Sequence, residues 1–302
     1  MLAASMSQPH AMPKAPPGAP SPAADSTQVV QARPKSDLAL RLGTAGVTAP
    51  LIIWSLYFGP PWFFPMLAVI ACSFAAYELF AMIAPKHVVL RAYGSLATLG
   101  VFGAMVVPGA QAHLAGVVIG CVVIGMLMAL VKAEPLEDAA NRTGWAIAGP
   151  IYIGGTFGAI AALFDRPHGG SWVIVTLLFS FLSDTAGYFV GRKWGKHKLS
   201  PVVSPKKTIE GAIGGLAAGL LSGVFMSLTL LPVLPLWHAV PLALVATAAG
   251  QAGDLCESLI KRSAGVKDSG SVLPGHGGFL DRSDAMMFVS AVVWAYVTLR
   301  GV

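Results

Sequence analysis

Long runs without charged side chains alternate with short charged loops from Arg41 to the end of the chain. A run of about 20 apolar residues, coiled as a helix, spans the roughly 30 Å hydrocarbon core of a membrane. Residues 92–131 contain no Asp, Glu, Lys or Arg, and as one helix they would measure about 60 Å. This run is therefore expected to fold back at Pro108-Gly109. The uncharged run 211–253 is expected to fold back at residues 232–235 for the same reason.

The pattern predicts nine membrane-spanning helices. Membrane-spanning backbone is satisfied only in helices or closed β-barrels, and the alternating pattern of a barrel is absent. The predicted fold class is therefore all-α and polytopic, an integral membrane protein. The expected spans are residues 42–59, 63–84, 92–108, 113–132, 145–164, 171–190, 211–231, 236–258 and 284–300.

Composition agrees with this fold and separates the N-terminal segment from the rest. Charged residues make up 11% of the chain, against about 25% in soluble proteins, and mean hydropathy is +0.69. These values exclude an ordinary soluble enzyme. Residues 1–38 hold seven of the 22 prolines and are predicted to form a disordered Pro/Ala-rich cytoplasmic tail, followed by a transmembrane domain over 39–302. The three cysteines lie in apolar stretches and are expected to be buried.

The formal net charge of +6 comes from cations gathered in particular loops. Residues 191–209 carry six Lys and Arg and no acid, and residues 259–283 carry four more cations. Two spans separate these loops, so they lie on one side, which the positive-inside rule makes cytoplasmic. No nucleic-acid partner is expected, because there is no soluble domain and no aromatic residues interleave the basic run.

Two aspartates, Asp184 and Asp254, fall in the cytoplasmic third of otherwise uncharged helices. An ionised carboxylate there costs about 2.5 kcal/mol or more, so each needs a partner. One interpretation is a structural polar contact between helices. The other is a functional site, which two such residues beside basic loops favour.

Further carboxylates recur at helical spacing. Asp254, Glu257, Ser258 and Lys261 stand at i, i+3, i+4 and i+7, and Asp281 is followed by another Asp three residues later, so each set shares one helix face. Carboxylates without a cysteine in the group suit Mg²⁺, which takes one or two of them and completes its shell with phosphates and water. The alternative is an ion-pair network at a helix end.

Two segments are candidates for phosphate binding. Residues 274–278 form a glycine-rich turn before a helix start, where backbone N–H groups favour an anion; His276 contacts phosphate there or caps the loop. In residues 204–208, Ser-Pro-Lys-Lys-Thr, we expect the proline to fix a turn so that Lys206, Lys207 and Thr208 converge at a helix start. The alternative is that these lysines only set the membrane orientation.

The polar block over residues 258–284 resembles the signature of the phosphatidate cytidylyltransferases, or CDP-diacylglycerol synthases. The matching pattern is Ser258-x-x-Lys261-Arg262, Lys267-Asp268-x-Gly270 and Leu273-Pro274-x-His276-Gly277-Gly278-x-x-Asp281-Arg282-x-Asp284. Asp184 and the 204–208 segment also look like blocks of that family. The resemblance is specific over about 184–284, which we take as the catalytic region.

The resemblance implies the reaction of CTP with phosphatidate to give CDP-diacylglycerol and pyrophosphate at the cytoplasmic face of the bacterial inner membrane. The resemblance implies Mg²⁺ as the cofactor and allows a second metal ion. It is also compatible with a homodimer. The metal ligands would be Asp184, Asp254, Asp281 and Asp284. The catalytic residues would be Asp254, Lys261, Arg262, Lys267, Asp281, Arg282 and Asp284, and the substrate-binding residues Ser204, Lys206, Lys207, Thr208, Ser258, Asp268, His276, Gly277 and Gly278.

Two other functions stay open on the sequence. A CTP-dependent lipid kinase would also need metal and basic loops, but it would need a base for the lipid hydroxyl. A transporter would also carry intramembrane aspartates, although here they gather at one face and no inverted repeat is visible.

Overall fold

A computed structural model describes residues 36–131, 135–270 and 277–301 of the chain. Within these ranges the chain forms nine α-helices, which confirms the predicted number and the all-α polytopic fold class. The helices are α1 (Ser36–Tyr57), α2 (Phe63–Ile83), α3 (Val88–Val106), α4 (Leu114–Val131), α5 (Ala139–Phe164), α6 (Gly169–Trp194), α7 (Ile209–Leu228), α8 (Leu236–Ser263) and α9 (Leu280–Arg300). Two short 3₁₀ helices, η1 (Ala110–His113) and η2 (Leu136–Asp138), and two strands, β1 (Lys198–Ser200) and β2 (Ser204–Thr208), complete the fold.

Both predicted fold-back points are confirmed. Helix α3 ends at Val106, and Gly109 adopts φ of 81° before η1 and α4, a left-handed conformation that glycine reaches without steric cost. Helix α7 ends at Leu228 and α8 begins at Leu236, with Pro232 and Pro235 between them. At the N-terminal end, α1 begins at Ser36, so residues 36–38 belong to a helix and not to the predicted tail; residues 1–35 lie outside the described part.

Among the described residues, seven helical segments are long and apolar enough to cross a membrane, and they correspond to α2 through α8. Helices α1 and α9 do not meet this criterion. The first five residues of α9 include Asp281, Arg282 and Asp284, yet Val289, Val293 and Val297 on it are fully buried. The chain is an integral membrane protein, and α9 is held inside the helix bundle by its apolar C-terminal part.

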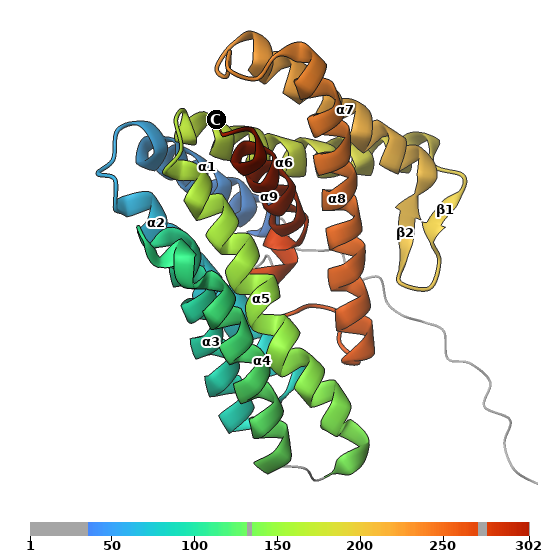
Figure 1. Cartoon of the computed structure of the whole chain (residues 1–302). Coiled ribbons are helices and arrows are strands. Elements are labelled where there is room, and N and C mark those ends of the chain that lie inside the picture. Colours follow the sequence, from blue (N-terminus) through green and yellow to red (C-terminus); the bar gives the residue numbers. More distant parts are fainter. Residues whose placement is uncertain (1–35, 132–134, 271–276, 302) are drawn as a thin grey trace, which may run out of the picture.

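Helix α9 joins the two halves of the bundle. Its valines pack with Trp172, Phe179 and apolar residues of α8 in one hydrophobic cluster. Its Leu280 and Met287 pack in a second cluster formed with α2, α3 and α5. Figure 1 shows α9 in the middle of the molecule, between α5 and α8. The position of its N-terminal turn is therefore set by helices from both halves.

The loop between α6 and α7 forms an antiparallel β-hairpin, which corrects the prediction of a proline-fixed turn. Pro205 lies within strand β2, and the chain reverses at residues 201–203. The Glu210 carboxylate fixes the hairpin base: it accepts hydrogen bonds from the backbone N–H of Lys196 (3.0 Å) and His197 (3.3 Å), and it pairs with His197 Nδ1 (2.7 Å). The hairpin projects from the bundle beside α7 and α8 (Figure 1).

The cysteine prediction is correct for two residues and wrong for the third. Cys72 and Cys121 are buried, whereas Cys256 is exposed. Cys256 stands two residues after Asp254 on α8, about 200° around the helix, so it faces away from the side that carries the aspartate.

Candidate functional site

A cavity of about 550 Å³ lies where four helices and the hairpin meet. The C-terminal halves of α6 and α8 and the N-terminal turns of α7 and α9 contribute to it, so it belongs to one end of the bundle. Its polar lining is drawn largely from the residues expected on sequence: Asp184, Lys206, Lys207, Thr208, Asp254, Asp281, Arg282 and Asp284, joined by Ser183, Tyr188, Arg192 and Gln251.

Three carboxylates from three helices line the same cavity. Asp184 on α6, Asp254 on α8 and Asp284 on α9 interact electrostatically. Asp284 is 8% exposed, and its Oδ1 accepts a hydrogen bond from the Ala285 N–H at 2.7 Å. Like charges that approach in a partly buried site repel one another unless a cation lies between or beside them. The arrangement is therefore suited to binding positive charge.

Cations from the hairpin and from α9 line the same cavity. Lys207 Nζ lies 2.6 Å from Asp254 Oδ2, and Lys206 and Arg282 are also part of the lining. Gln251 links the helices behind them, because its Nε2 donates to the Ala212 carbonyl at 3.0 Å. The cavity thus brings carboxylates and basic side chains together, as a site for a metal ion and phosphates requires.

Asp281 is held by protein donors on both of its carboxylate oxygens. Oδ1 accepts from Lys261 Nζ at 2.6 Å, and Oδ2 accepts from the backbone N–H of Ser269 and of Gly278, both at 3.0 Å. Lys261 also pairs with the fully buried Glu257 carboxylate on the preceding turn of α8. As a metal ligand, Asp281 would have to give up one of these donors.

The donor set fits Mg²⁺ bound by two carboxylates better than by three. Among the described residues, no group of three His, Cys, Asp or Glu side chains is close enough to hold one ion. Mg²⁺ needs only one or two carboxylates when phosphates and water complete its shell. Asp184, Asp254 and Asp284 offer oxygen atoms to the cavity, whereas Asp281 is engaged elsewhere. The metal assignments stay predictions, with Asp281 the least suited of the four.

Several predicted site residues lie outside the cavity lining. Lys261 and Ser258 are buried behind it, with Ser258 Oγ 3.5 Å from Asp254 Oδ1. Arg262 is exposed and donates to the Val266 carbonyl at 3.1 Å. Lys267 and Asp268 are exposed, and Ser204, Gly277 and Gly278 are likewise absent from the lining. His276 lies outside the described residues.

Thr208 has a structural partner. Its Oγ1 accepts a hydrogen bond from the Gly211 N–H at 3.2 Å, so it caps the N-terminus of α7. The predicted helix start at this residue is confirmed. The hydroxyl oxygen is the acceptor in this cap, so its own proton is still available to a phosphate, and phosphate binding by Thr208 stays a prediction.

A family model described as the cytidylyltransferase family matches residues 39–300, which include every helix that lines the cavity. The chain belongs to the cytidylyltransferase family. Curated relatives named phosphatidate cytidylyltransferase include those of Staphylococcus saprophyticus (46% identical), Staphylococcus haemolyticus (48%) and Staphylococcus aureus strain COL (47%). Each alignment covers 124 residues, 41% of this chain and 48% of the relative. The chain therefore spans about half the length of the curated relatives it matches.

One buried carboxylate of this family member was missed by the sequence analysis. Glu78 on α2 is 2% exposed and accepts hydrogen bonds from Ser269 Oγ (2.9 Å), Phe279 N (3.0 Å) and Leu280 N (2.9 Å). It is the one Asp, Glu, Lys or Arg within Phe63–Ile83. A lone charged residue inside an apolar span is itself a signal of function, and it could have been found on that ground.

Glu78 also changes the interpretation of the glycine-rich turn. In the described structure, carboxylates of the protein itself lie at the N-terminus of α9. Glu78 accepts hydrogen bonds from the backbone N–H groups of Phe279 and Leu280, and Asp281 accepts one from the N–H of Gly278. Of the turn over residues 274–278 that was expected to contact substrate phosphate, Gly278 already donates its N–H to Asp281. Residues 274–276 lie outside the described part of the chain.

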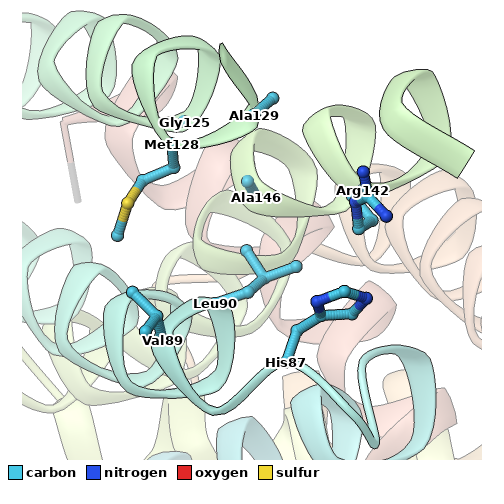
Figure 2. Close-up of a pocket in the computed structure, with 8 residues that line it drawn as sticks. All are labelled: His87, Val89, Leu90, Gly125, Met128, Ala129, Arg142 and Ala146. Atoms are coloured by element: carbon cyan, nitrogen blue, oxygen red, sulfur yellow. The ribbon is translucent and has the colours of Figure 1, made fainter. Parts of the chain in front are cut away.

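A second cavity, of about 240 Å³, lies between the start of α3, the end of α4 and the start of α5. Figure 2 shows Arg142 and His87 on one side of it and the apolar side chains of Val89 and Met128 on the other. Arg142 Nη2 donates to the Pro135 carbonyl at 3.2 Å. The residues that line this cavity include no carboxylate, so it lacks the oxygen donors that the larger cavity offers to a metal ion.

Proposed function

We propose that this protein transfers the cytidylyl group of CTP to phosphatidate, forming CDP-diacylglycerol and pyrophosphate. The observation that carries the proposal is the joint presence of Asp184, Asp254 and Asp284 with Lys206, Lys207 and Arg282 in one cavity. The names of the staphylococcal relatives, at 46–48% identity over part of the chain, support the same substrates.

The nucleophile of this reaction is a phosphate oxygen that is already ionised at neutral pH, so no general base is needed. The reaction instead requires two mutually repelling anions to be neutralised and aligned. We assign Lys206, Lys207 and Arg282 to the phosphates of CTP and of the lipid. The oxygen attacks the α-phosphorus, the bond to the β-phosphate oxygen breaks, and these cations stabilise the departing pyrophosphate.

Two of the carboxylates Asp184, Asp254 and Asp284 would hold Mg²⁺, with phosphates and water completing its shell, while Asp281 fixes the adjacent loop. When bound, the ion would neutralise charge on the triphosphate as it develops. The pairing of Lys207 with Asp254 at 2.6 Å keeps both side chains directed into the cavity. A phosphate would compete for the lysine and a cation for the aspartate, so binding of both would exchange one internal pair for two intermolecular ones.

We further propose that the cavity opens at the cytoplasmic face of the bacterial inner membrane. The support is charge: the hairpin loop carries six Lys and Arg and no acid, and basic loops are retained on the cytoplasmic side. CTP would reach the cavity from the cytosol, while phosphatidate keeps its acyl chains in the bilayer.

The products formed from CTP distinguish this proposal from a lipid kinase. Purified protein in lipid nanodiscs containing both phosphatidate and a lipid alcohol would be given CTP and Mg²⁺, and the soluble products would be separated by anion-exchange chromatography. The proposal predicts pyrophosphate in equal amount to CDP-diacylglycerol. CDP as the soluble product would contradict it and favour the kinase, and unchanged CTP would favour the transporter.

A further inference from the structure

The Glu78 carboxylate provides the hydrogen-bond acceptors for the segment that enters α9. Oε2 accepts from Leu280 N and Ser269 Oγ, both at 2.9 Å, and Oε1 accepts from Phe279 N at 3.0 Å. The first N–H groups of a helix have no partner within the helix, and the N-cap residue of α9, Phe279, makes no side-chain cap hydrogen bond. A carboxylate from α2 therefore caps α9 and lies at the positive end of its dipole.

Two glycines leave the space that this carboxylate occupies. A Cβ atom on Gly270 would lie 2.6 Å from Glu78 Oε1, and one on Gly278 would lie 2.6 Å from Oε2. Real Cβ atoms essentially never approach so closely. Both glycines belong to the pattern that resembles the family signature, and their role here is to let Glu78 reach the backbone.

The contacts of Glu78 continue into the polar network behind the cavity. Ser269, whose hydroxyl donates to Glu78, donates its backbone N–H to Asp281 Oδ2. Asp281 Oδ1 in turn accepts from Lys261 of α8. Glu78 from α2 and Asp281 from α9 thus both hydrogen-bond to Ser269 and to the backbone of residues 278–280.

We propose that Glu78 is a positioning residue: it fixes the rotation and depth of the first turn of α9, and thereby holds Arg282 and Asp284 in the cavity. The Glu78 side chain does not line the cavity, so its effect is transmitted through α9. The inference rests on the proposed function for what the cavity does. It extends the functional unit to α2, outside the catalytic region expected over about 184–284.

Glu78→Gln tests the inference, because the amide keeps the size of the side chain but has one acceptor oxygen and no charge. At least one of the three donors then loses its acceptor. We expect kcat to fall roughly 10- to 100-fold, since small displacements of reacting groups have effects of this size. The KM for CTP should change by less than about threefold, because Lys206 and Lys207 are untouched.

Two further variants show whether charge and position matter. Glu78→Asp keeps the charge on a shorter side chain and should restore part of the lost kcat. Glu137→Gln makes the same chemical change at an exposed acid between α4 and α5 and should behave like the wild type. Equal losses in Glu78→Gln and Glu137→Gln would contradict a positioning role.

Limited trypsin digestion gives a measurement that does not depend on activity. Lys267 is exposed in the segment that Glu78 holds, and cleavage of a held segment requires local opening. Cleavage after Lys267 should be about tenfold faster in Glu78→Gln than in the wild type, and unchanged in Glu137→Gln. If Glu78→Gln does not yield folded protein, Glu78→Asp carries the same two measurements.

The outcomes separate this inference from the proposed function. A wild-type protein that makes no CDP-diacylglycerol defeats the proposed function, while the cleavage rates still test whether Glu78 holds the segment. An active wild type with unchanged kcat in Glu78→Gln overturns the positioning role, whatever the cleavage rates. A reduced kcat together with faster cleavage after Lys267 supports it.

Discussion

Lys207 Nζ lies 2.6 Å from Asp254 Oδ2, joining the β-hairpin to the middle of α8. Both side chains are about three-quarters buried, at 27% and 25% exposed. The pair connects a residue assigned to phosphate with one assigned to Mg²⁺, and it links the hairpin to α8 at the cavity. Through this contact the loop with six cations lines the cavity, which is the basis for proposing a role for it beyond orientation.

Replacing Lys207 tests the role of this pair in binding. A charge-assisted hydrogen bond contributes roughly 1.5–3 kcal/mol, and about 1.4 kcal/mol corresponds to a factor of ten. Lys207→Ala, and likewise Lys206→Ala, should reduce kcat/KM for CTP by about 10- to 150-fold. Lys198→Ala removes an equal charge from strand β1, outside the cavity lining, and should have little effect. If all three variants match the wild type, the lysines only set orientation.

Asp284→Asn removes a charge from the carboxylate cluster while keeping the shape of the side chain. Asp284 is buried beside Asp184 and Asp254, so the loss of its charge should weaken Mg²⁺ binding. We expect activity to fall by orders of magnitude with an unchanged elution profile of the folded protein. EDTA should abolish wild-type activity, and added Mg²⁺ should restore it. Near-normal turnover of Asp284→Asn at saturating Mg²⁺ would rule out the ligand assignment.

Lys261 is expected to contribute mainly to stability. It pairs with the fully buried Glu257 and with Asp281, and removing one partner of a buried ion pair leaves an uncompensated charge. Lys261→Met should lower the free energy of unfolding by about 3–5 kcal/mol, measured by denaturant titration in detergent. The double variant Lys261→Met with Glu257→Gln should recover part of the loss. No recovery would show that the Glu257 charge is not what Lys261 compensates.

The membrane orientation is accessible to labelling at the hairpin tip, where Val202 is 91% exposed. In a Cys256→Ser background, which removes the exposed native cysteine, Val202→Cys should react with an impermeant maleimide only after the membrane is opened. Asp165→Cys, in the exposed loop between α5 and α6, should react in intact cells. The opposite pattern would invert the topology and remove cytosolic CTP as the substrate.

The helices were predictable from sequence because membrane thickness sets the length of a span, and prolines and Gly109 mark where the long runs must reverse. The hairpin was not predictable, since strands of three and five residues around Pro205 have no visible periodicity. The grouping of Asp184, Asp254 and Asp284 was predictable, because the expected topology places all three at the same end of the helix bundle.

The polar network around Asp281 could not be derived from helical spacing. The i, i+3 relation between Asp281 and Asp284 predicts that they share a face, but the partners of Asp281 come from α8 and from the segment before α9. Glu78 lies about 200 residues away in the chain and meets α9 only through the tertiary fold. Spacing therefore identified the carboxylates of α8 and α9. Only the tertiary contacts distinguish Asp254 and Asp284, whose oxygens are offered to the cavity, from Asp281, whose oxygens are bonded to protein donors.

The fate of the two ends of the CTP triphosphate tests the central claim most directly. Purified protein, phosphatidate, a lipid alcohol and Mg²⁺ would be incubated with CTP labelled either at the α- or at the γ-phosphate, and the lipid phase would be extracted and counted. The account predicts label in lipid from α-labelled CTP alone, and its loss in Asp284→Asn. Label in lipid from γ-labelled CTP, or from neither, would contradict it.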